Sequence, residues 1–106
     1  MLEEIALKDP TRIVRRAAVK RIANEEILGD IALNDKNKNV RRAAVKRIAN
    51  QDILEEITQK DPVFFVRKEA TKKLTNIIVL TEISQKDPNE EVRNVATARL
   101  KNLTKI

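Results

Sequence analysis

The sequence predicts an all-helical protein built from four copies of a 26-residue repeat. The eleven residues VRRAAVKRIAN occur at 14–24 and recur without change at 40–50. One glycine and three prolines among 106 residues leave little material for β-turns, which favours helices joined by short connections. Because each repeat must bury its apolar side on its neighbours, this pattern is typical of an α-solenoid.

The repeats are expected at residues 2–27, 28–53, 54–79 and 80–105, within a single domain that spans residues 1–106. Several columns hold the same residue type in all four repeats. The two charged columns are Asp9, Asp35, Asp61 and Asp87, and Arg15, Arg41, Arg67 and Arg93.

Each repeat is expected to begin with a first helix, for which residues 24–33 give the clearest pattern. Asn24 is suited to the N-cap position, and Leu28 and Ile31 lie on one apolar face. An Asp-Pro dipeptide follows in three of the four repeats. Since proline cannot continue a helix but fits the first turn of the next one, this dipeptide predicts the break.

The second helix is expected at residues 11–23 of the first repeat. At 100° per residue Val14, Ala18 and Ile22 lie within about 80° of one another, with Ala17 beside them. These residues form the predicted buried stripe, and the alanines mark a close approach of two helices. One column is expected on the flank of the stripe, namely Val19, Val45, Thr71 and Thr97.

The recurring polar residues are interpreted as structural. Each Asp is expected to cap the second helix, and the Arg six residues later to reach an Asp within its own repeat or in a neighbouring one. The Asn column, which includes Asn24, is compatible with a left-handed residue after the second helix or with a cap on the next first helix.

The pattern L-x-x-I-A-x-x-D-P-x-x-x-V-R-R-A-A-V-x-x-I resembles HEAT repeats, in particular the short class named for phycobilisome-lyase relatives. The resemblance covers practically the whole chain. It implies a right-handed α-solenoid of four helical hairpins, an Asp–Arg ladder, and a concave surface formed by the second helices. It identifies no catalytic residue, because such repeats serve many roles.

The composition argues against an enzyme. With no cysteine and no histidine, the chain has no thiolate or imidazole chemistry and none of the usual zinc ligand sets. No calcium-loop pattern is present either. We therefore expect no catalytic residue, no cofactor and no metal site. The longest apolar run, residues 77–80, predicts no membrane span, and we expect a cytoplasmic protein.

Positive charge concentrates in the expected second helices, which carry +5, +5, +3 and +1 in repeat order. On the helical wheel one set of cations points away from the buried stripe. These six residues are the predicted binding site for a partner: Arg16, Lys20, Arg42, Lys46, Lys68 and Lys72.

Three interpretations of this basic stripe remain open. It could bind a partner protein with an acidic surface, which would make the chain a scaffold or interaction module. It could instead bind nucleic acid, although the absence of Trp and Tyr argues against base stacking. It could also be a solvated surface that binds nothing.

Phe64 and Phe65 are the only aromatic residues and fall in the expected turn of the third repeat. One is expected to cover the adjacent helix ends and the other to be exposed. Packing and an apolar patch for a partner or for self-association are both compatible with this position. Leu103 and Ile106 could shield the last repeat or mediate dimerisation, so we expect a monomer or a weak homodimer.

Overall fold

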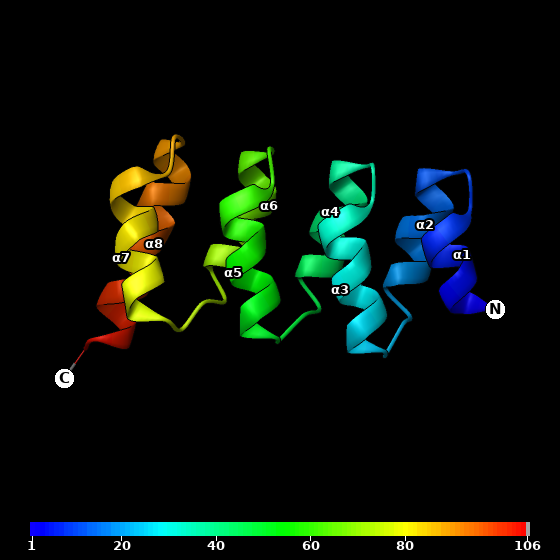
Figure 1. Cartoon of the computed structure of the whole chain (residues 1–106), viewed down its shortest axis with the longest axis horizontal. Coiled ribbons are helices and arrows are strands. Elements are labelled where there is room, and N and C mark those ends of the chain that lie inside the picture. The colour runs from blue at the N-terminus through cyan, green and yellow to red at the C-terminus, as the bar shows by residue number, and fades with distance from the viewer. Residues whose placement is uncertain (106) are drawn as a thin grey trace. The chain divides into compact units, whose positions relative to one another are not determined.

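The computed structural model describes residues 1–105 and is all-helical, with eight helices and no strand in that range (Figure 1). Ile106, one of the two residues considered for shielding or dimerisation, lies outside the described residues. The helices are α1 (Leu2–Lys8), α2 (Arg12–Val19), α3 (Glu25–Asn34), α4 (Lys38–Val45), α5 (Gln51–Lys60), α6 (Phe64–Thr71), α7 (Ile77–Lys86) and α8 (Glu90–Leu103).

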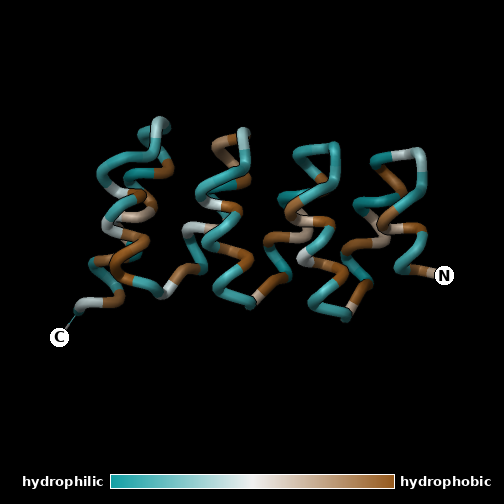
Figure 2. The backbone as a smooth tube through the Cα atoms, viewed as in Figure 1, coloured by the Kyte–Doolittle hydropathy of each residue, from teal (hydrophilic) through white to brown (hydrophobic). Residues whose placement is uncertain are grey.

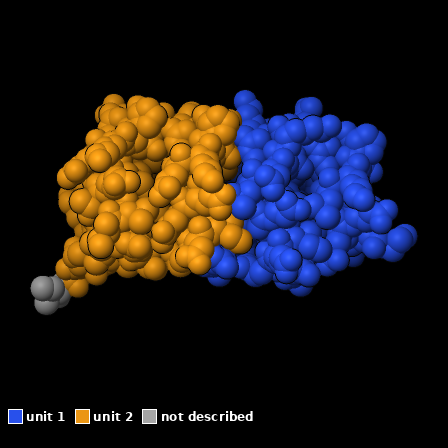
Figure 3. All heavy atoms as spheres, in the orientation of Figure 1, with its two compact units in different colours: residues 1–50 blue, residues 51–106 orange. Residues whose placement is uncertain are grey.

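The chain divides into two compact units, Met1–Asn50 and Gln51–Ile106, which Figure 3 distinguishes by colour. In unit 1, α1 packs on α2, α3 packs on α4, and the two hairpins meet through α2 with α4 and α1 with α3. In unit 2, α5 packs on α6, α7 packs on α8, and α6 meets α8. Each unit therefore contains two hairpins with a buried seam between them.

The cores consist of aliphatic side chains from both helices of each hairpin. Within every helix the backbone alternates between hydrophobic and hydrophilic segments, as amphipathic helices require (Figure 2). Fully buried side chains in unit 1 include Val19, Ile22, Leu28, Ile31, Val40, Val45 and Ile48, and in unit 2 Leu54, Ile57, Val66, Leu74 and Leu80.

Two members of the asparagine column, Asn24 and Asn76, cap the helix that follows them. The side chain of Asn24 accepts hydrogen bonds from the backbone N–H groups of Glu26 at 2.9 Å and Ile27 at 3.2 Å. Asn76 does the same at the start of α7, at 3.0 and 3.2 Å. Both caps have φ near −75°, and no residue in 1–105 has a positive φ, so the left-handed alternative is wrong.

The aspartate column does not occupy the N-cap position that was expected. The N-cap of α2 is Thr11, two residues after Asp9, and the Oδ1 of Asp9 accepts the N–H of Thr11 at 2.8 Å. Equivalent bonds join Asp35 to Asn37 and Asp87 to Asn89, at 2.8 and 2.9 Å. Each aspartate therefore fixes the connection between the helices, as side chains of this type do in turns.

The second helices of the first three hairpins end earlier than expected. Rather than continuing to residue 23, α2 stops at Val19, and the backbone N–H of Ile22 then donates to the Val19 carbonyl at 3.3 Å. The guanidinium of Arg47 donates to the carbonyls of Val19 (2.7 Å) and Ile22. A side chain from the neighbouring hairpin thus satisfies carbonyls that another helical turn would have used. In contrast, α8 continues to Leu103.

The expected buried stripe is wrong in part. Val19, placed on the flank by the wheel, is 0% exposed, whereas Val14 is 40% exposed and Ala17 is also exposed. The reason is that α2 packs on both α1 and α4, so the buried arc extends to the side that carries Val19. The equivalents Val45 and Thr71 are buried as well, whereas Thr97 is exposed as expected. The counterparts of Val14 in the other hairpins, Val40, Val66 and Val92, are 0% exposed, which confirms that column of the stripe.

Phe64 and Phe65 are not in a turn, because they form the first two residues of α6. Their rings meet edge to face, with centroids 5.9 Å apart and an interplanar angle of 78°. Both side chains are half-buried, so the expected division into one covered and one exposed ring is wrong. Exposed large apolar side chains in unit 2 lie instead at Ile77, Ile78 and Leu103.

Candidate cationic binding site

A depression with a volume of about 310 Å³ lies on the solvent-facing side of α2 in unit 1. Arg12, Arg16 and Lys20 line it, because residues four apart lie one above another on the same helix face. Its remaining wall is formed by Ile13, Ala17, Asn37 and Asn39.

A second depression, of about 260 Å³, shares Arg16, Lys20 and Asn39 with the first and is therefore continuous with it. Arg42 and Lys46 of the second hairpin join it there. The structure thus brings together four of the six cations that the sequence singled out. The full lining is Arg16, Lys20, Asn39, Arg42, Ala43, Lys46 and Arg47, and it contains no acidic residue.

Neighbouring cations on α2 have different environments. Arg15 is 3% exposed and its guanidinium is bound to Asp35 and to the carbonyl of Asp9. Arg16 and Lys20 are exposed, and within residues 1–105 neither side chain makes a hydrogen bond or an ion pair. One helix therefore carries a cation that holds the fold together and two that are available to a ligand.

The two predicted cations of unit 2 are engaged by carboxylates. The Nζ of Lys68 lies 3.2 Å from Oε1 of Glu91, and the Nζ of Lys72 lies 3.5 Å from Oε2 of Glu69. In the repeat alignment Glu69 replaces Ala17 and Ala43. Acidic residues within unit 2 thus offset Lys68 and Lys72, whereas none lines these two depressions of unit 1.

Four polar residues of the site were not predicted from the sequence: Arg12, Asn37, Asn39 and Arg47. Arg12 had a detectable signal, since it precedes Arg16 by the same four residues that separate Arg16 from Lys20. No sequence pattern indicated Arg47, because the position of its side chain depends on the carbonyls of Val19 and Ile22 in the neighbouring hairpin.

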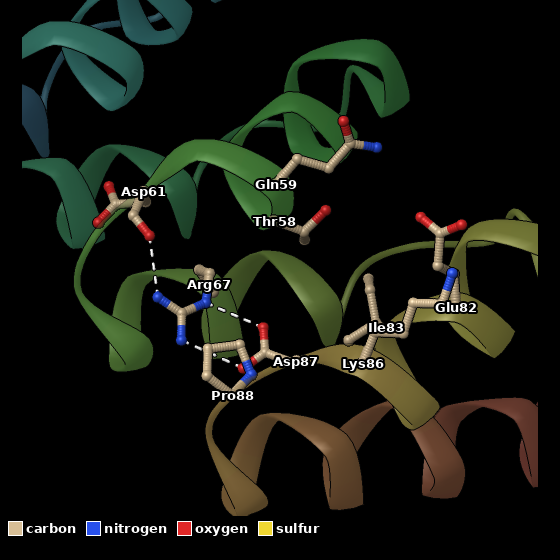
Figure 4. Close-up of a pocket in the computed structure, with 9 residues that line it drawn as sticks. All are labelled: Thr58, Gln59, Asp61, Arg67, Glu82, Ile83, Lys86, Asp87 and Pro88. Atoms are coloured by element: carbon tan, nitrogen blue, oxygen red, sulfur yellow. Dashed lines mark hydrogen bonds and ion pairs between the residues drawn. The ribbon is translucent and has the colours of Figure 1, made fainter.

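The Asp–Arg columns form a second polar cluster, and its groups satisfy one another. In unit 2 the guanidinium of Arg67 donates to both oxygens of Asp87, at 2.9 and 3.1 Å, and to the backbone carbonyl of Asp61 at 2.9 Å (Figure 4). A pocket of about 350 Å³ surrounds this contact. Because these donors and acceptors are already engaged, the cluster has a structural role.

Two other kinds of site have no counterpart in residues 1–105. No group of three potential metal ligands comes together in that range. None of its helices has both the length and the apolar character needed to cross a membrane.

Comparison of the chain with protein-family models, with curated proteins and with solved structures found no match.

Proposed function

We propose that this protein is a non-enzymatic interaction module that binds an acidic segment of a partner protein. The segment would lie in the two joined depressions of unit 1, against Arg16, Lys20, Arg42 and Lys46. The observation that carries the proposal is the lining itself, in which cations from two hairpins converge without any acidic residue.

The geometry favours a carboxylate-bearing peptide of a few residues. Guanidinium groups bind carboxylates through two parallel hydrogen bonds, and Arg12 and Arg16 can each present such a fork. Asn39 lies in both depressions and adds a neutral donor and acceptor between the charges. Together these groups suit an extended segment with two or more Asp or Glu side chains.

Nucleic acid is the second candidate, because phosphates satisfy the same cations. No Trp or Tyr is present, and Phe64 and Phe65 pack against each other in unit 2. A stacking platform for bases, which single-strand binders use, therefore has no counterpart among the residues of unit 1.

We also infer that the hairpins are HEAT-like repeats of a right-handed α-solenoid. Support comes from the sequence columns and from the ladder contact, which has the same form in unit 1 (Arg15 to Asp35) and in unit 2 (Arg67 to Asp87). A low-resolution solution scattering curve would test the solenoid, since a globular packing of the hairpins would give a smaller radius of gyration.

The function is tested by fluorescence anisotropy with a labelled acidic peptide and a labelled oligonucleotide of equal net charge, over a range of salt concentrations. The acidic peptide is expected to bind more tightly, and a peptide with Gln and Asn in place of Glu and Asp is expected not to bind. For a double-stranded oligonucleotide, four phosphate contacts would give a slope of log K against log salt of about −3.6. Tighter binding of the oligonucleotide would favour the second candidate, and failure of both probes at low salt would refute the site.

A further inference from the structure

The pocket around Arg67 shows how two successive hairpins of unit 2 meet. The α5–α6 hairpin provides the donor half, with Thr58, Gln59 and Arg67. The α7–α8 hairpin provides the acceptor half (Figure 4), which consists of Glu82, Ile83, Lys86 and Asp87.

The same acceptor half recurs on α1. Three repeat lengths before Glu82, Ile83, Lys86 and Asp87 stand Glu4, Ile5, Lys8 and Asp9, with identical residue types. These four residues and Met1 line a depression of about 270 Å³.

Two observations show that this α1 surface lacks a partner within residues 1–105. Ile5 is 40% exposed and Val14 on α2 is also 40% exposed, whereas their counterparts Ile83 and Val92 are 7% and 0% exposed. The Oδ1 of Asp9 accepts the N–H of Thr11, and its Oδ2 has no hydrogen bond or ion pair in the described chain.

The donor half recurs on the α7–α8 hairpin. One repeat length after Thr58, Gln59 and Arg67 stand Ser84, Gln85 and Arg93. The Nη1 of Arg93 donates to the backbone carbonyl of Asp87 at 2.6 Å, as Arg67 does to Asp61. Its Nε and Nη2, which in Arg67 bind a carboxylate, have no such partner in residues 1–105.

We propose that these two surfaces are the halves of one interface, and that a second copy of this chain binds head to tail. Arg93 of one molecule places its Nε and Nη2 on the carboxylate of Asp9 in the next, and Ile5 and Val14 of that next molecule become covered. The guanidinium and the carboxylate are complementary in charge and in fork geometry. The interface is independent of the basic depressions, so either proposal can fail alone.

Arg93 is half-exposed and lies away from the extended end of α8. Arg93 lies near the start of α8, and the part of the helix that departs from the repeat pattern ends at Leu103, about 15 Å further along the axis. The interface is heterologous, because different residues come from each copy. Such an interface produces rings or open chains rather than a symmetric pair.

Analytical ultracentrifugation of the whole chain, from micromolar to millimolar concentration, tests the proposal. The average mass is expected to rise with concentration and to pass beyond that of a dimer. A monomer at every concentration, or a mass that stops at a dimer, would overturn it.

Two variants locate the contact. Asp9→Asn keeps an oxygen that can accept the N–H of Thr11 and removes the negative charge, and Arg93→Gln removes the guanidinium. Each is expected to raise the dissociation constant on the order of tenfold or more, while Glu3→Gln, an exposed change on α1 outside the depression that Asp9 lines, leaves it unchanged.

Mixing the two variants provides the decisive measurement. Asp9→Asn leaves the Arg93 surface intact, and Arg93→Gln leaves the Asp9 surface intact, so an equimolar mixture of the two proteins should form a one-to-one complex that does not grow. Circular dichroism confirms that both variants are folded. Unaltered association of either variant alone, or no complex in the mixture, would contradict the head-to-tail contact.

Discussion

The guanidinium of Arg15 donates to both carboxylate oxygens of Asp35, at 3.0 and 3.2 Å, and to the backbone carbonyl of Asp9 at 2.8 Å. One side chain thereby joins the connection of its own hairpin to the connection of the next. Arg15 is 3% exposed, and the paired side chains each retain only 4% of their surface. In such surroundings an unpaired partner would be costly, so this contact largely determines how the two hairpins of unit 1 meet.

Replacing Arg15 by alanine should therefore reduce the free energy of unfolding by about 3–5 kcal/mol, since the Asp35 carboxylate would be left buried and unpaired. Urea denaturation followed by circular dichroism would measure the loss. Arg16→Ala is the control, because the next residue is exposed and its side chain has no partner in residues 1–105. Equal midpoints for the two variants would show that the ion pair contributes nothing.

The asparagine caps give a second prediction. Asn76→Ala should cost about 1 kcal/mol, because two N–H groups at the start of α7 lose their acceptor. Asn102 belongs to the same sequence column but lies inside α8, where it caps nothing. Thermal melts should show a lower midpoint for the first substitution and no decrease for Asn102→Ala; a similar decrease for both would argue against capping.

Two alanines on second helices test the packing of unit 1. Ala44 is 0% exposed, and Ala44→Leu should destabilise the protein by roughly 1–3 kcal/mol because the core has no room for the added atoms. Ala17, which the helical wheel places in the buried stripe, is exposed, and Ala17→Leu should leave the unfolding midpoint unchanged. The opposite ranking in denaturant titrations would restore the stripe expected from the sequence.

The binding site is tested by neutralising two cations in either unit. Arg16→Gln with Lys20→Gln should weaken binding of the acidic peptide on the order of tenfold, since both residues line both depressions. Lys68→Gln with Lys72→Gln removes the same charge from residues that already face Glu91 and Glu69. Anisotropy titrations should show little change for this second variant, and equal losses would indicate a general charge effect.

Much of the fold follows from the repeat in the sequence. The helical class, the caps at Asn24 and Asn76, and the pairing of Arg with Asp were all accessible, because they depend on residues at fixed local spacings. The end of α2 at Val19 could not be predicted from such local spacings. It depends on the side chain of Arg47, which lies 28 residues further along the chain and reaches the Val19 carbonyl only after the hairpins have packed.

The sequence predicted that Arg16, Lys20, Arg42 and Lys46 share one surface, but it did not predict which other residues line that surface. Helical periodicity correctly indicated that Arg16 and Lys20 share an exposed face, and the same periodicity places Arg12 on it. Glu69, which faces Lys72, precedes it by three residues in the sequence, but Glu91, which faces Lys68 of α6, lies on α8. A wheel drawn for one helix contains no information about such a neighbour.

The form of the Arg15–Asp35 contact also bears on how a gene for such a chain can change. Its donor lies in one 26-residue block and its acceptor in the next, and the Arg67–Asp87 contact has the same arrangement. An in-frame duplication would therefore insert a block that fits on both sides. Its arginine would pair with the aspartate of the block after it, and its aspartate would pair with the arginine of the block before it. Recombination between the coding segments for the identical residues 14–24 and 40–50 is a direct route to that event, so chain length can evolve without the invention of a new joint.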